Sequence, residues 1–177
     1  VGVIWWAILP FGRLATLVEP ADMTFLLPKE KEMGSYLSQG LRHSIGIPFF
    51  IELLVCGALL PLVVLTNQVG FSTFFIYLTM LWSLKFANLR IQRLACYQNT
   101  KNSTFKLMFG WFLLSGGVIF ISLYLGAIFG TILGLASASI FYVLTKEKGR
   151  LLDWSKMIER ENTRLHRIYQ FINLFTD

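Results

Sequence analysis

Long apolar runs alternate with short polar segments along most of the chain. A membrane-spanning helix needs ~20 mostly apolar residues. Four runs reach that length, at residues 45–66, 69–88, 107–125 and 127–145. A fifth run, residues 1–18, starts at the first residue, so we interpret it as a span truncated at its start. The pattern predicts an all-α polytopic membrane helix bundle, with about five transmembrane helices.

The polar segments between these runs predict the orientation. Two connections are very short and uncharged, Asn67-Gln68 and Gly126, whereas segments 19–44, 89–106 and 146–177 are longer and carry the charges. The basic residues in and beside the second of these segments are Lys85, Arg90, Arg93, Lys101 and Lys106. Because positive residues are retained on the cytoplasmic side during insertion, we expect all three charged segments to be cytoplasmic.

Composition agrees with a multi-pass protein of the cell membrane. Of the 177 residues, 55% are hydrophobic and 15% charged, which is too few charges to cover a soluble domain. The net charge of +6 is explained by positive cytoplasmic segments and by contact with anionic membrane lipid. It therefore indicates no nucleic-acid partner.

Sequence signatures of catalysis are missing. The chain has no phosphate-binding G-x-x-x-x-G-K-[ST] loop, no H-E-x-x-H and no paired C-x-x-C, and its two histidines, His43 and His166, fall near the predicted membrane surfaces. We expect no catalytic residues, no metal and no cofactor, so an enzyme is not predicted.

Two ionisable residues fall inside apolar runs. Arg13 precedes the cytoplasmic end of the first run and Glu52 lies about two helical turns into the second. An unpaired charge at mid-bilayer is costly, which makes an ion pair between them a reasonable hypothesis. The alternative is that Arg13 extends to the lipid headgroups while Glu52 meets water or another helix.

Three glycines recur every fourth residue at the start of the last run: Gly126, Gly130 and Gly134. This spacing of small residues lets two helices approach closely. The helices could be the two members of one hairpin, or two copies of the chain in a homodimer.

The tail, residues 146–177, is predicted to be an amphipathic helix. Its apolar residues alternate at spacings of three and four: Leu151, Trp154, Ile158, Leu165, Ile168, Ile172 and Phe175. Glu161 interrupts this stripe. We expect the helix to lie on the inner leaflet, and docking beneath the bundle is the alternative.

Segment 19–44 is predicted to contain a second, short helix, at about residues 28–41. Pro28 is a favourable first residue because a helix does not use that N–H. Met33, Tyr36 and Leu37 share one face of it. That face would either lie on lipid or present Met33 and Tyr36 to a cytoplasmic partner.

Two stretches, ADMTFLLPKEKEMGSYL and YQFINLFTD, resemble the EcsB-type permeases of bacterial ABC transporters. The resemblance implies a membrane subunit that binds a separate ATP-binding subunit through a coupling helix at about residues 28–41. It also implies the coupling residues: Asp22, Phe25, Leu26, Leu27, Pro28, Glu30, Tyr36 and Leu37. A membrane scaffold without transport activity, which binds a regulatory partner, is the alternative function.

Overall fold

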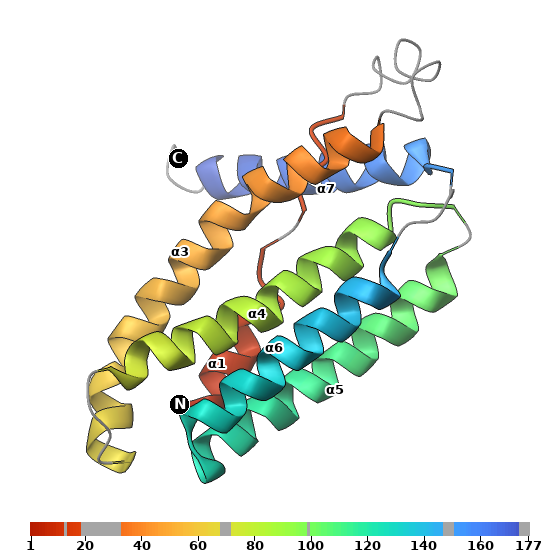
Figure 1. Cartoon of the computed structure of the whole chain (residues 1–177). Coiled ribbons are helices and arrows are strands. Elements are labelled where there is room, and N and C mark those ends of the chain that lie inside the picture. Colours follow the sequence, from red (N-terminus) through yellow and green to blue (C-terminus); the bar gives the residue numbers. More distant parts are fainter. Residues whose placement is uncertain (13, 19–32, 68–71, 99, 147–150, 174–177) are drawn as a thin grey trace.

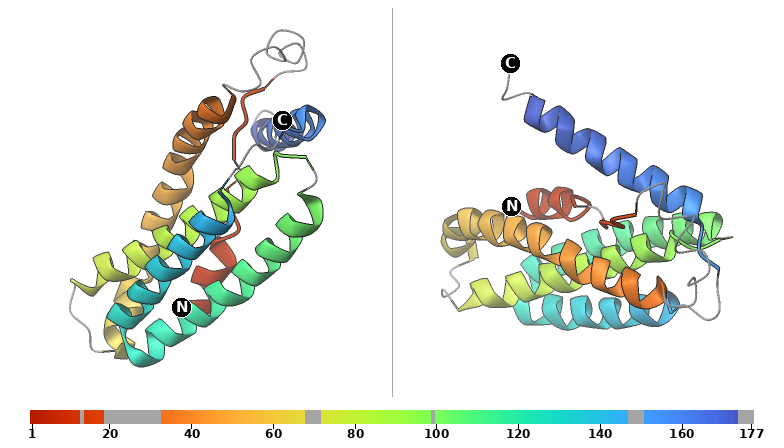
Figure 2. Two further views of the ribbon diagram at one scale, coloured as in Figure 1. Left: turned by 45° about the vertical axis from the view of Figure 1, so that its right-hand side comes forward. Right: turned by 90° about the horizontal axis from the view of Figure 1, so that it is seen from above.

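The computed structural model describes residues 1–12, 14–18, 33–67, 72–98, 100–146 and 151–173. The helices in these ranges are α1 (Gly2–Ile8), α3 (Met33–Asn67), α4 (Thr73–Leu94), α5 (Lys101–Leu125), α6 (Ala127–Leu144) and α7 (Trp154–Asn173). The long helices α3 to α6 run side by side, and α7 lies at one end of them (Figures 1 and 2). The prediction of an all-helical fold is confirmed for this part of the chain.

Three of the described helices are long and apolar enough to cross a membrane. They contain the stretches Ser35–Leu65, Asn102–Leu125 and Ala127–Leu144. The predicted number of five spans is therefore not confirmed. The expected spans at 1–18 and 69–88 correspond to helices α1 and α4. Neither is among the helices suited to crossing a membrane, and the reason differs between the two.

Helix α4 is the most polar of the four long helices and lies between the others (Figure 1). Its polar side chains Lys85, Asn88 and Gln92 are buried, as are most of its apolar ones. Helices α3, α5 and α6 all contact it. A helix with this many polar groups cannot face lipid without a large cost, and packing inside the bundle avoids that cost.

Helix α1 ends at Ile8, so the predicted continuous span over residues 1–18 is not observed. Pro10 lacks an N–H, so it cannot donate the hydrogen bond to the residue four positions earlier that would continue α1. Two further residues have positive φ, Gly12 at 90° and Leu17 at 52°. We refer to residues 9–12 and 14–18 as the non-helical segment; it continues from α1 toward the end of the bundle where α7 lies (Figure 1).

Helix α3 is continuous over 35 residues, from Met33 to Asn67. The sequence predicted two separate helices here, a surface helix at about 28–41 and a span at 45–66. In the structure they join without a break, and residues 28–32 of the surface helix lie outside the described part. Contacts on the inner face of the helix explain why it continues, because Leu37 and Leu41 are buried there. Gly40, on the same part of the helix, has no Cβ. The Ala15 carbonyl oxygen lies 2.9 Å from the position that a Cβ would occupy.

Gly126 alone separates α5 from α6, with a φ of 108° that glycine adopts without strain. The next two glycines of the repeat face other helices of the same chain. A Cβ on Gly130 would lie 2.1 Å from Ser122 Cβ on α5, and one on Gly134 would lie 2.7 Å from Ser83 Oγ on α4. The small residues therefore permit close packing within the chain at these two positions.

Two apolar clusters form the core. The first lies among the long helices and α1, and the second joins α7 to the ends of α3 and α4 and to the non-helical segment. Buried members of the second cluster are Leu14, Val18, Leu37, Leu41, Leu89, Cys96, Tyr97, Leu152, Trp154 and Met157. The first half of α7 is thus docked on the bundle, which differs from the expected position on the lipid surface.

A short antiparallel pairing fixes the start of α7 to the end of α4. Tyr97 and Leu152 form the bridge. The Gln98 N–H donates to the Leu151 carbonyl, and the Asp153 N–H donates to the Cys96 carbonyl, both at 2.9 Å. The starts of α3 and α5, the ends of α4 and α6, and α7 all lie at this end of the molecule (Figure 1). We call it the charged end.

Candidate functional site

The non-helical segment begins inside the bundle, where polar side chains of α4 bind its carbonyl groups. The Lys85 ammonium donates to the Leu9 carbonyl at 2.7 Å and also to the Phe11 carbonyl. Asn88 Nδ2 donates to the same Leu9 carbonyl at 3.3 Å. Backbone groups at membrane depth must be satisfied within the protein. Lys85 and Asn88, which lie on one face of α4, meet that requirement where α1 stops.

Gln92, one turn further along α4, binds the next part of the segment with both ends of its amide. Its Nε2 donates to the Gly12 carbonyl at 3.3 Å, and its Oε1 accepts from the Leu14 N–H at 2.8 Å. Nε2 also donates to Asn88 Oδ1 at 2.9 Å, which orients both amides. The polar face of α4 therefore replaces the hydrogen bonds that a continuous helix would have made for itself.

The second half of the segment is bound by α3 and α7. Ser44 Oγ accepts from the Ala15 N–H at 2.8 Å, and the Tyr36 hydroxyl donates to the Leu17 carbonyl at 2.9 Å. Glu161 Oε2, on α7, accepts from the Thr16 N–H at 3.1 Å. One continuous stretch of backbone is thus hydrogen-bonded to the interior of α4, to the start of α3 and to α7.

Glu161, which interrupts the apolar stripe of the tail, is a buried acceptor with 4% of its surface exposed. Burial disfavours its charged form, but hydrogen bonds from Arg164 and from the Thr16 and Leu17 N–H groups outweigh this effect and lower its pKa below 4.5. Arg164 Nη2 lies 2.5 Å from Oε1. Glu161 therefore connects α7 to the non-helical segment as a carboxylate.

We expect acid to weaken the docking of α7. Because the pKa of Glu161 is lower in the folded state, its contribution is present above 4.5 and is lost as the pH falls through that lower value. The thiol of Cys96, which is fully buried under α7, reports on docking. In a variant with Cys96 as its single cysteine, the rate of reaction with 4,4′-dithiodipyridine would be divided by the rate for the unfolded chain at the same pH, which removes the change in thiolate fraction. This ratio should rise as the pH falls from 6 to 3.

Glu161→Gln should flatten this pH dependence, because the amide keeps the shape but not the charge. Glu159→Gln, at an exposed position on the same helix, is the matched control and should keep the profile of the unmodified chain. Identical profiles for Glu161→Gln and the unmodified chain would contradict the role assigned to Glu161.

Glu52 of α3 is a buried ionisable group within the bundle. It is 3% exposed, and neither carboxylate oxygen has a hydrogen-bond partner in the structure. Arg13, its hypothetical partner, lies outside the described residues. The described cation that acts electrostatically on Glu52 is Lys85 of α4. Lys85 was counted among the residues of a cytoplasmic loop, and its complete burial corrects that assignment.

The predicted coupling residues divide into two groups. Asp22, Phe25, Leu26, Leu27, Pro28 and Glu30 lie outside the described residues. Met33 begins α3, Tyr36 is half-buried and bonded to Leu17, and Leu37 is a core residue with 1% of its surface exposed. Leu37 therefore packs within the chain rather than on its surface, and the face containing Tyr36 is turned toward the non-helical segment.

Sequence reasoning missed the polar residues of this site. Asn88 and Gln92 follow Lys85 at spacings of three and four, which places them on one helix face, and Thr16 and Glu161 are separated by most of the chain. The spacing on α4 and Pro10 in the first run were available signals. No signal in the sequence indicated the contact between Thr16 and Glu161 of α7. Within the described residues, no cluster of histidine, cysteine or acidic side chains could hold a metal ion.

The arrangement is a non-helical segment that follows α1 and is bound by side chains from three helices, α3, α4 and α7. In membrane proteins, non-helical backbone at membrane depth is tolerated where it is buried in protein or lines a cavity, and broken helices form the binding sites of many transporters. Here the segment joins the middle of the bundle to the charged end. A displacement of α7 or of the start of α3 would act on it directly.

Comparison with known proteins gives the family. The family described as "Bacterial ABC transporter protein EcsB" matches residues 1–177, the whole sequence. Protein EcsB of Bacillus subtilis (strain 168) is 26% identical over 188 residues, covering 99% of this chain and 43% of the relative, so the chain spans less than half of that relative's length. No solved structure matches. With a family match over every residue and three helices suited to a membrane, the chain belongs to the EcsB family of bacterial ABC transporter proteins.

Proposed function

We propose that this chain is part of the membrane-spanning permease subunit of an ABC transporter, and that it couples to a separate ATP-binding subunit through segment 19–44. The observation that carries the proposal is the family match over residues 1–177. The residues proposed for the contact lie between Asp22 and Tyr36, and of these Phe25, Leu26 and Leu27 offer apolar side chains.

The charged end supports the proposed orientation. Basic residues of α4, α5 and α7 gather at this end, whereas the opposite end has the uncharged turn at Gly126 (Figure 1). By the positive-inside rule the charged end would face the cytoplasm, where an ATP-binding subunit is located. The absence of a phosphate-binding loop from the sequence is compatible with a partner that supplies ATP hydrolysis.

The non-helical segment gives the proposed coupling a physical route. Tyr36 at the start of α3 binds Leu17, and Glu161 of α7 binds Thr16. The same segment continues to Lys85 in the interior of α4. A partner that moves the start of α3 would shift hydrogen-bonded backbone inside the bundle, as a rigid-body switch between two packed arrangements.

Retention of the ATP-binding subunit tests this function. We would co-express the full-length protein with the ATP-binding subunit of its transporter, purify through the permease, and measure the ratio of the two chains. Phe25→Asp should reduce retention by about tenfold or more, since loss of a buried apolar contact from an interface costs about 2 kcal/mol.

Leu125→Asp is the matched control, because it also introduces an aspartate at an apolar residue. Leu125 is 67% exposed and lies next to the Gly126 turn, at the opposite end of the molecule. It should leave retention unchanged. Failure of the unmodified protein to retain the subunit would contradict the proposed function and favour a membrane scaffold. Equal loss with both variants would contradict the assignment of the contact to segment 19–44.

A further inference from the structure

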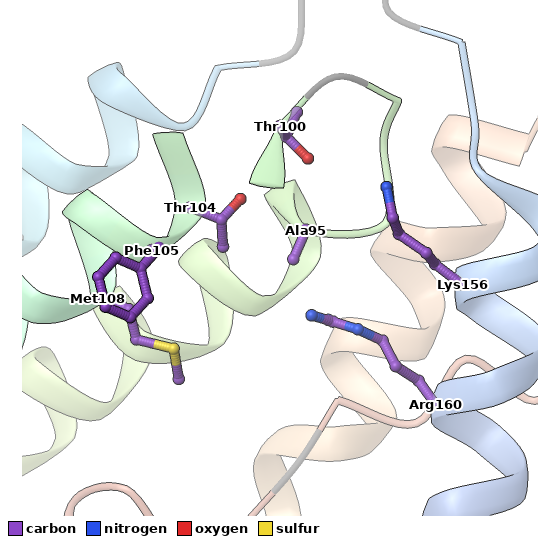
Figure 3. A pocket seen from close by; sticks show the side chains of 7 residues that line it. All are labelled: Ala95, Thr100, Thr104, Phe105, Met108, Lys156 and Arg160. Carbon is purple, nitrogen blue, oxygen red and sulfur yellow. The ribbon is translucent and has the colours of Figure 1, made fainter. Parts of the chain in front are cut away.

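A cavity of about 240 Å³ lies at the charged end, between the start of α5, the end of α4 and α7. Figure 3 shows two cations of α7, Lys156 and Arg160, that extend across it toward Ala95 and the α4–α5 connection. Thr100 and Thr104 line the opposite wall. The cavity therefore has two positive charges on one side and two hydroxyl groups on the other.

One of these hydroxyl groups has no hydrogen-bond partner in the part of the chain that the structure describes. Thr104 is 8% exposed, and its Oγ1 forms no hydrogen bond in the structure. A buried hydroxyl without a partner costs free energy, so its presence at a cavity wall points to a group that binds there. Thr100, which donates to the Tyr97 carbonyl at 2.7 Å, keeps its acceptor sites.

The surroundings favour a negatively charged group. Thr100 is the residue before α5, no side chain caps that helix, and no acid lies in its first turn. A helix start carries partial positive charge, which adds to the two cations. Lys156 also pairs with Asp153 at 2.6 Å, and Arg160 donates to the Gln92 carbonyl at 3.0 Å. These contacts fix the positions of both cations, and each cation has further N–H groups that can donate to a bound group.

An apolar groove continues from this cavity. A second cavity of about 300 Å³ shares Phe105 and Met108 with the first, and its other lining residues are Pro10, Phe109, Trp111 and Phe112. Phe105 and Phe109 are 74% and 58% exposed. Both lie near the start of a helix suited to crossing a membrane, Asn102–Leu125. A cationic pocket thus lies beside an apolar groove near the start of a helix suited to crossing a membrane.

We propose that this composite site binds an anionic phospholipid, with the phosphate between Thr104, Lys156 and Arg160 and an acyl chain along Phe105 and Met108. A soluble phosphate compound would use the cationic pocket but not the groove. A neutral lipid would use the groove but gain little from the two cations. The site is independent of the coupling function proposed above, because it involves no residue of segment 19–44.

Native mass spectrometry of the full-length protein in detergent tests the site. The protein would be titrated with phosphatidylglycerol and with phosphatidylcholine of the same acyl chains. We expect preferential binding of phosphatidylglycerol. Lys156→Gln and Arg160→Gln should each weaken it about fivefold, the effect of one basic residue at an anionic lipid surface.

Two further variants separate binding from folding. Thr104→Val removes a hydroxyl that has no partner among the described residues, so it should maintain or raise stability and weaken phosphatidylglycerol binding about two- to fivefold. Lys106→Gln removes an exposed charge on the same helix, outside the cavity, and should have no effect.

Three results would overturn the proposal. These are equal binding of the two lipids, a loss with Lys106→Gln equal to that with Lys156→Gln, and displacement of phosphatidylglycerol by inorganic phosphate at the same concentration. The last result would assign the pocket to a soluble phosphate compound.

Discussion

Replacement of Lys85 by methionine is expected to destabilise the protein by roughly 3 kcal/mol or more. Methionine fills a similar volume but donates no hydrogen bond. The Phe11 carbonyl would lose the partner described here, the Leu9 carbonyl would keep only the longer bond from Asn88, and Glu52 would lose its nearby cation. The measurement is thermal or denaturant unfolding of the full-length protein in micelles.

Two comparisons make this result specific. Lys106→Met removes an exposed lysine, and its effect should stay within about 0.5 kcal/mol. Glu52→Gln combined with Lys85→Met should recover part of the loss, because the buried carboxylate is then neutral. Equal stabilities for Lys85→Met and Lys106→Met would show that Lys85 does not hold the non-helical segment.

Gly130→Ala should be the second strongly disruptive change, at about 1–3 kcal/mol. The added methyl group would lie 2.1 Å from Ser122 Cβ and 3.0 Å from Ser122 Cα. Since the latter belongs to the backbone of α5, relief of the contact requires the two helices of the hairpin to separate. Unfolding in micelles measures this effect as well.

Gly117→Ala is the matched control within helix α5. Nothing lies within 4 Å of the position of its Cβ, so alanine should be neutral or stabilise the helix by up to about 1 kcal/mol. If Gly130→Ala behaved like Gly117→Ala, close packing at the glycine repeat would be contradicted.

The sequence predicted the three helices suited to crossing a membrane better than it predicted α1 and α4. The runs at 45–66, 107–125 and 127–145 correspond to α3, α5 and α6, since uninterrupted apolar residues leave a helix as the form that satisfies every backbone group in a bilayer. The turn at Gly126 follows from the same pattern, because glycine there separates two apolar runs.

Interior elements were harder to predict because their polar residues resemble those of a loop. Lys85 and Arg90 were assigned to the charged segment that follows the span at 69–88 and to its border, although α4 continues to Leu94 with both inside the helix. Hydropathy cannot distinguish a lysine in water from one that binds two carbonyl groups. The contact of Glu161 with Thr16 joins residues far apart in the sequence, so no local sequence pattern predicts it.

The proposed contact between the charged end and an ATP-binding subunit is tested most directly by site-specific photo-crosslinking in membranes. A photoreactive residue would replace Gln39, exposed on α3 near the charged end, or Tyr124, which is 86% exposed beside the opposite turn. Crosslinks to the ATP-binding subunit from position 39 and none from position 124 are the predicted result. Crosslinks from position 124, or none from position 39, would contradict the proposed coupling.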